Sequence, residues 1–269
     1  MIKELFNKQR PLMVIGFTFV LLFVALMIAS LFDSTEITGV NRWIKPMKFA
    51  SSIALYLWTL AIYLYFISGR ELAKNIIGRG AIAMLVGEII LIVMQAARGT
   101  ISHFNTATLF DSLVFYAMGL MILANTFLII YLLILYFRAR VDLPKAIVWG
   151  MRYGIILFLL ASVEGGLMSA MLRHSVGVAD GGAGLPFVNW STKGGDLRVA
   201  HFIGMHAFQA IPFFAYTMEK YNVKSATFWT TVFAAVYFVF FTFLFVQAMF
   251  GKPLLQVFRN SNLVEICFL

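Results

Sequence analysis

The stretch LVFYAMGLMILANTFLIIYLLILYF, residues 113–137, decides the fold class of this chain. It contains no charged residue and only one strongly polar residue, Asn125. A helix needs about 20 apolar residues to span a bilayer. Because backbone polar groups must be paired in lipid, so long a run has to be helical, whereas barrel strands would be shorter and would alternate. The stretch therefore predicts a transmembrane helix.

The rest of the chain repeats this pattern. Of the 269 residues, 61% are hydrophobic and 12% are charged, against about 25% charged in soluble domains. We predict an all-α, polytopic integral membrane bundle of about seven transmembrane helices, which forms a single domain over residues 1–251 and is followed by a C-terminal tail, 252–269. The predicted spans are 12–32, 49–68, 80–97, 113–137, 146–171, 199–218 and 226–250.

Two features near the chain ends exclude a signal peptide and cysteine-based sites. The apolar run 12–32 follows a basic start and is too long for a signal peptide, whose apolar core has about 7–15 residues. We therefore interpret it as the first span. The single cysteine, Cys267, excludes an internal disulfide, a cysteine-based metal cluster and a C-x-x-C redox motif.

The net charge of +9 is spread over short segments between apolar runs. Positive loops beside membrane spans explain this pattern, so we expect a lipid bilayer and a small or lipophilic ligand as partners, and no nucleic acid. A slight excess of basic residues on the N-terminal side predicts a multi-pass protein of the cell membrane with a cytoplasmic N-terminus and an outer C-terminus. These residues are Lys3, Lys8, Arg10, Arg70, Lys74, Arg79, Arg138, Arg140, Lys145, Arg152, Lys220 and Lys224. The oligomeric state is not predicted.

The segment GGDLRVAHFIGMHAFQAIP, residues 194–212, is the most polar part of the membrane region. Ionisable residues are costly in lipid and usually face a partner or a water-filled cavity. Polar residues of other spans fall near the same predicted membrane side. We therefore expect one pocket in the outer half, with Glu88 deeper than the other members. Its candidate members are Lys48, Glu88, Gln95, Arg98, His103, Glu164, Asp196, Arg198, His201, His206 and Gln209.

His206, His201 and His103 are the candidate metal ligands. Five residues turn a helix by about 500°, so the rings of His201 and His206 point about 140° apart. A metal site would therefore need His103 or Glu164 from another helix. In a divalent-metal hydrolase these side chains would hold zinc, and Glu88 or Glu164 would handle protons.

A b-type haem is the second cofactor left open. His103 and His206 would be its axial ligands, and Arg98 or Arg198 would contact the propionates. Gly99, Gly165, Gly166 and Gly204 would give the ring clearance, but close helix packing is the favoured explanation of these glycines. The order of Ser102, His103, Asp111 and the later histidines resembles only in part that of certain seven-span membrane hydrolases, whose late histidines are four residues apart, so no family is assigned. A retinal protein is excluded because residues 226–250 contain no lysine.

The sequence leaves two function classes. The first is a metal- or haem-dependent membrane enzyme or redox protein acting on a small or lipophilic substrate. The alternative is a transporter or ligand-binding receptor that uses the same pocket without chemistry. In the first class Glu164, Glu88 and Arg98 are the candidate catalytic residues, with Arg98 as an electrostatic clamp. The candidate substrate-binding residues are Gln95, Gln209, Asp196, Arg198 and Lys48.

Overall fold

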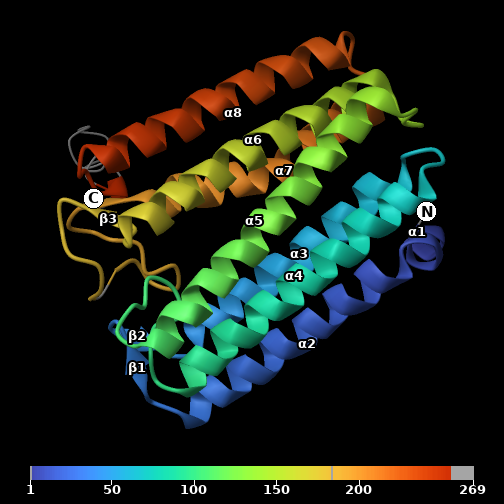
Figure 1. Ribbon diagram of the computed structural model, residues 1–269. Coiled ribbons are helices and arrows are strands. Elements are labelled where there is room, and N and C mark those ends of the chain that lie inside the picture. Colours follow the sequence, from blue (N-terminus) through green and yellow to red (C-terminus); the bar gives the residue numbers. More distant parts are fainter. Residues whose placement is uncertain (1, 183, 256–269) are drawn as a thin grey trace.

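The computed structural model describes residues 2–182 and 184–255, and this part of the chain is mostly helical (Figure 1). The helices are α1 (Ile2–Lys8), α2 (Arg10–Phe32), α3 (Ile44–Tyr65), α4 (Glu71–Ala97), α5 (Leu109–Arg138), α6 (Lys145–Met171), α7 (Leu197–Lys220) and α8 (Ala226–Met249). Two short antiparallel hairpins pair β1 (Glu36–Ile37) with β2 (Val40–Asn41), and β3 (Ser175–Val176) with β4 (Gly195–Asp196). The fold is an all-α membrane bundle, as predicted.

Six helices are long and apolar enough to cross a membrane: α2, α3, α4, α5, α6 and α8. Helix α7, predicted as a seventh span, is 24 residues long, but it is not in that group, because His201, His206 and Gln209 interrupt its apolar stretch. It nevertheless packs along α6 and α8 (Figure 1). Both β hairpins and the end of α8 lie at one end of the bundle, called the hairpin end below; α1 marks the opposite, N-terminal end.

Several helices extend beyond the predicted spans. Helix α3 begins at Ile44, where Pro46 fits because the first turn needs no backbone donor. Helix α4 begins at Glu71, nine residues before the predicted span. Hydropathy marks only the apolar part of a helix, so polar end turns are missed. Only the start of the predicted tail is described, because residues 256–269, including Cys267, lie outside the described residues.

The helices form two packed groups joined by α5. Helices α2, α3 and α4 pack together, as do α6, α7 and α8, while α5 crosses between the groups and contacts both α4 and α6 (Figure 1). Small residues bring α6 and α7 close: a Cβ atom on Gly154 would lie 2.9 Å from the carbonyl oxygen of Ala207. Such close approach of backbones is the usual way in which membrane helices associate.

The two groups are tied in the middle of the bundle by Tyr63 of α3. Pro212 lies inside α7 and has no N–H, so the carbonyl of Phe208 loses its intrahelical donor. The Tyr63 hydroxyl donates to this carbonyl at 3.0 Å, and the two rings stack with centroids 4.2 Å apart. A second link joins Gln209 Nε2 to Thr59 Oγ1 at 3.1 Å. Tyr63 therefore satisfies a backbone group that the proline leaves free.

This arrangement predicts that the effect of replacing Tyr63 depends on Pro212. Tyr63→Phe is expected to lower the free energy of unfolding by about 1–2 kcal/mol, because a buried carbonyl loses its donor. In a Pro212→Ala background the same substitution should cost clearly less, since the introduced alanine can donate its backbone N–H to Phe208 within the helix. Thermal unfolding in detergent of the wild type, the two single variants and the double variant measures the cost of Tyr63→Phe in each background. Tyr131→Phe is the control, because Tyr131 is exposed and its hydroxyl has no hydrogen bond within the described residues. Equal losses in both backgrounds would contradict the link.

The same two groups are also joined at the N-terminal end. The turn after α3 pairs with the turn after α5 through an antiparallel bridge between Ile67 and Val141. Ser68 N donates to the Arg140 carbonyl at 2.9 Å, and Asp142 N donates to the Phe66 carbonyl at 3.1 Å. Backbone hydrogen bonds therefore hold these two turns together.

Candidate functional site

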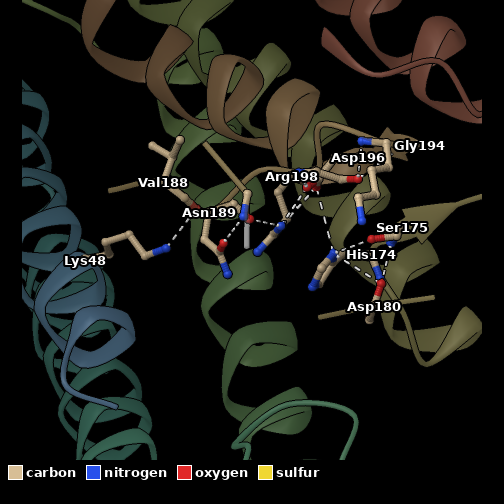
Figure 2. Close-up of polar contacts among 12 residues, drawn as sticks. Lys48, His174, Ser175, Asp180, Val188, Asn189, Gly194, Asp196 and Arg198 are labelled. Carbon is tan, nitrogen blue, oxygen red and sulfur yellow. Dashed lines mark hydrogen bonds and ion pairs between the residues drawn. The ribbon is translucent and has the colours of Figure 1, made fainter. Parts of the chain in front are cut away.

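The first turns of α3 and α7 both lie at the hairpin end. Figure 2 shows Lys48 of α3 reaching toward the loop between α6 and α7, where its Nζ donates to the carbonyl of Val188 at 3.0 Å. The next residue of that loop, Asn189, accepts a hydrogen bond from Arg198 of α7 through its carbonyl. The loop therefore lies between the cationic side chains of two helix N-termini.

Asp196 fixes the start of α7. It is the N-cap residue, and its side chain accepts from the backbone N of Arg198 at 3.0 Å and from Ser191 N at 2.7 Å. The Arg198 guanidinium donates to both carboxylate oxygens, at 2.9 and 2.6 Å. Burial alone raises the pKa of Asp196, but the hydrogen bonds and charge of Arg198 lower it below its usual value. Asp196 and Arg198 thus form a buried, ionised pair.

Lys45 and Lys48 stand one turn apart at the start of α3. Lys45 interacts electrostatically with Glu88, Arg198 and Lys48, yet its ammonium group has no hydrogen bond or ion pair to any described residue. Among the described residues Lys48 donates to Val188 alone. The two lysines therefore keep most of their donor capacity. The positive end of the helix dipole opposes these cations and would stabilise an anion beside them.

Glu88 of α4 interacts electrostatically with Lys45. Glu88 is 1% exposed, and within the described part of the chain neither of its carboxyl oxygens has a hydrogen-bond partner. His103 Nε2 is 3.6 Å from Glu88 Oε1, while its Nδ1 is 3.1 Å from Ser102 Oγ. Burial lowers the pKa of His103 well below its usual value, and Lys45 lowers it further, so His103 is neutral at pH 7.

His174 completes the group on the loop side (Figure 2). Its Nδ1 lies 3.3 Å from Asp180 Oδ1 and 3.9 Å from Asp196 Oδ1. Asp180 also accepts from the backbone N of His174 and Ser175, at 3.0 and 2.7 Å. Burial, followed by the charge of Arg198, lowers the pKa of His174 to about 4. The hairpin-end cluster, as we call it, comprises Lys45, Lys48, Glu88, His103, His174, Asp180, Asp196 and Arg198.

The pKa of His174 predicts a pH dependence of stability. Between pH 6.5 and about 4 the unfolded chain binds a proton at His174 and the folded chain does not, so folding becomes less favourable as the pH falls through this window. The lowered pKa of His174 corresponds to a loss of folding free energy of at most about 3 kcal/mol at acid pH. His174→Gln should remove part of the acid loss, measured as the difference in unfolding temperature between pH 7 and pH 4.5. An unchanged acid loss in the variant would contradict the assignment.

Arg98 and Gln95 form a separate group with Asp111. Arg98 Nη1 lies 2.6 Å from Asp111 Oδ1, and Gln95 Nε2 donates to the same oxygen at 2.9 Å. Thr108, the N-cap of α5, donates to the other carboxylate oxygen at 2.7 Å. The guanidinium also lies over the ring of Phe110. Arg98 is therefore neutralised and positioned by its neighbours, which is a structural role and does not require the expected clamp.

The three candidate metal ligands do not form a site. His201 Nδ1 is 2.9 Å from the Ala161 carbonyl, with its ring against Gly165, and His206 Nδ1 is 2.8 Å from the Phe202 carbonyl in its own helix. His103 instead contacts Ser102 and Glu88. Across the described residues no three His, Cys, Asp or Glu side chains are placed to hold a metal ion. The expected metal or haem site is thus not supported, because each of the three histidine rings has its own local partner.

The other predicted site residues lie in different surroundings. Glu164 of α6 is 4% exposed, and neither carboxyl oxygen has a hydrogen-bond partner among the residues described. Gln209 links α7 to α3 through Thr59. The expected single pocket is therefore replaced by several groups. Lys48, Glu88, His103, Asp196 and Arg198 share the hairpin-end cluster; Gln95 and Arg98 share the Asp111 group.

Three members of the cluster were not predicted from the sequence: Lys45, His174 and Asp180. Lys45 precedes the predicted span 49–68, although its spacing of three from Lys48 puts both on one face of a helix that begins at Ile44. His174 and Asp180 fall in the long connection 173–198, where no periodicity indicates which side chains turn inward.

Comparison with known proteins finds no matching family model, no similar curated protein and no similar solved structure. The chain's own geometry therefore carries the functional argument.

Proposed function

We propose that this integral membrane protein binds a small oxyanion, a carboxylate or phosphate, at the hairpin end, in the manner of a carrier or receptor. The observation that carries the proposal is the pair of lysines at the start of α3. Lys45 has no hydrogen-bond or ion-pair partner among the described residues, and Lys48 has one backbone carbonyl. Buried or partly buried cations of this kind normally have a counter-charge.

The surrounding backbone supports the same ligand class. The N-termini of α3 and α7 both lie at this end (Figure 1), and each contributes a partial positive charge. Of the nearby carboxylates, Asp196 is occupied by Arg198 and Asp180 by backbone N–H groups. Glu88 forms no ion pair with either lysine. An oxyanion between Lys45 and Lys48 would give both ammonium groups a direct partner, with Arg198 close enough to add to the field. A small anion needs no metal or haem to bind there.

The proposal is tested by ligand-dependent thermal unfolding of the full chain in detergent. Acetate, lactate, succinate and phosphate are compared with sodium chloride of equal ionic strength. A ligand present at 100 times its Kd stabilises the folded protein by about 2.7 kcal/mol, so a true ligand gives a clear rise in unfolding temperature.

Calorimetric titration with that ligand then measures the Kd of each variant. Lys45→Gln and Lys48→Gln should each weaken binding at least about tenfold, because each removes a charged donor. Arg140→Gln is the matched control, since Arg140 is exposed at the other end of the bundle. If none of the four anions stabilises the protein beyond chloride, or if both lysine variants bind as the wild type does, the proposal is wrong.

A further inference from the structure

Glu88 is a buried carboxyl group that no described residue satisfies by a hydrogen bond. Two titratable side chains face it, Lys45 from α3 and His103 from the loop after α4. The other charged residues on the adjoining parts of α4 and α5, Arg98 and Asp111, are paired with each other. The 3.6 Å between Glu88 and His103 is too long for a hydrogen bond, and His103 is neutral. Lys45 is therefore the cation available to keep Glu88 ionised.

Lys45 also faces the oxyanion site proposed above. It interacts electrostatically both with Glu88 and with the two other cations, Lys48 and Arg198. One ammonium group cannot fully neutralise two anions in a poorly solvated place, because each unpaired charge there is costly. An oxyanion next to Lys45 would thus leave the Glu88 carboxylate without its counter-charge. The least costly response is protonation of Glu88.

We infer that Glu88 is a proton-binding site and that Lys45 couples its protonation to oxyanion binding at the hairpin end. This inference rests on the proposed function and deepens it. In the empty state the positive charge of Lys45 favours the ionised form of Glu88, although the two groups form no ion pair. When a monovalent oxyanion binds, Lys45 neutralises the oxyanion, and Glu88 takes one proton from water to become a neutral carboxylic acid. One anion and one proton enter together, so the charge of the cluster does not change. Such coupling is the chemistry of a proton-linked carrier.

Proton uptake on binding is the first test. The full chain in detergent is titrated with acetate or lactate, both monovalent, near pH 9 in two buffers of different ionisation enthalpy, which gives the protons taken up per anion. The wild type should take up about one proton, and its Kd should rise about tenfold per pH unit once Glu88 is ionised in the free protein. Glu88→Gln should bind the anion with no proton uptake and little pH dependence. Glu164→Gln, a second buried carboxyl outside the cluster, should behave as the wild type.

Infrared difference spectroscopy supplies a readout that does not depend on affinity. Between about pH 5 and 9 the wild type should show a carbonyl band of a protonated carboxylic acid that Glu88→Gln lacks, and acetate should increase this band. Anion binding without proton uptake, or proton uptake that persists in Glu88→Gln, overturns the coupling and leaves the proposed function standing. The absence of a Glu88 band over the whole range overturns the proton site. If none of the probe anions binds, the proposed function and the coupling both fail.

Discussion

Asp196→Ala is expected to lower the free energy of unfolding by about 3 kcal/mol and the unfolding temperature by roughly 5–10 °C. The residue is 3% exposed and has three roles: it caps α7, it pairs with Arg198 and it holds Ser191 of the preceding loop. Loss of the cap alone costs about 1 kcal/mol. Most of the remainder comes from the partly buried Arg198 guanidinium that loses its counter-charge.

A second substitution separates these contributions. Arg198→Met added to Asp196→Ala should recover part of the loss, because replacing both partners of a buried pair with apolar groups removes the uncompensated charge. Thermal unfolding of both single variants and the double variant gives the coupling energy. Glu36→Ala is the control, since Glu36 is exposed and its side chain makes no ion pair or hydrogen bond among the described residues, and it should change stability by less than about 0.5 kcal/mol. Strictly additive losses would mean that the pair does not stabilise the fold.

Gly195→Ala is expected to be as damaging or more so, with a loss of about 3 kcal/mol or failure to fold. A Cβ atom at this position of β4 would lie 1.9 Å from the carbonyl oxygen of Ala248 and 2.7 Å from its carbonyl carbon. Both contacts are with the backbone at the end of α8, so no side chain can rotate away. The β3–β4 hairpin would have to separate from α8. Fluorescence-detected size exclusion and thermal unfolding measure the result.

Gly166→Ala is the matched control for this substitution. Its Cβ would meet no atom within 4 Å, and alanine is favoured over glycine inside a helix by up to about 1 kcal/mol. The control should be neutral or slightly stabilising. A Gly195→Ala protein as stable as Gly166→Ala would show that the hairpin does not pack against α8 as described.

The architecture could be predicted from the sequence because apolar length alone identifies a membrane helix. The run 113–137 is one continuous helix in the structure, α5. The helix ends were predicted less well. Residues 44–48 and 71–79 are helical despite their charges, since polar side chains at the membrane surface do not prevent helix formation. Segment 199–218 lies inside α7, although its polar residues keep α7 outside the group of clearly apolar spans.

The grouping of polar residues could be predicted only in part. Asp196 and Arg198 are two residues apart, so their contact is local. Lys48, Glu88 and His103 share one cluster because of how α3 and α4 rotate against each other, and a single sequence does not report helix rotation. The rotation of α7 against α6 likewise turns His201 toward Ala161 and leaves His206 against its own helix. That is why a convergent trio of histidines was expected and not found.

The bridge between Ile67 and Val141 has a mechanical consequence. It fastens the α2–α4 group to the α6–α8 group at the N-terminal end through main-chain hydrogen bonds. At the opposite end the direct tie described between Lys48 and Val188 is a single side-chain contact. A swing of one group against the other would therefore pivot near Ile67 and open widest around Lys48. Lys45 and Lys48 therefore lie where the two helix groups would separate most.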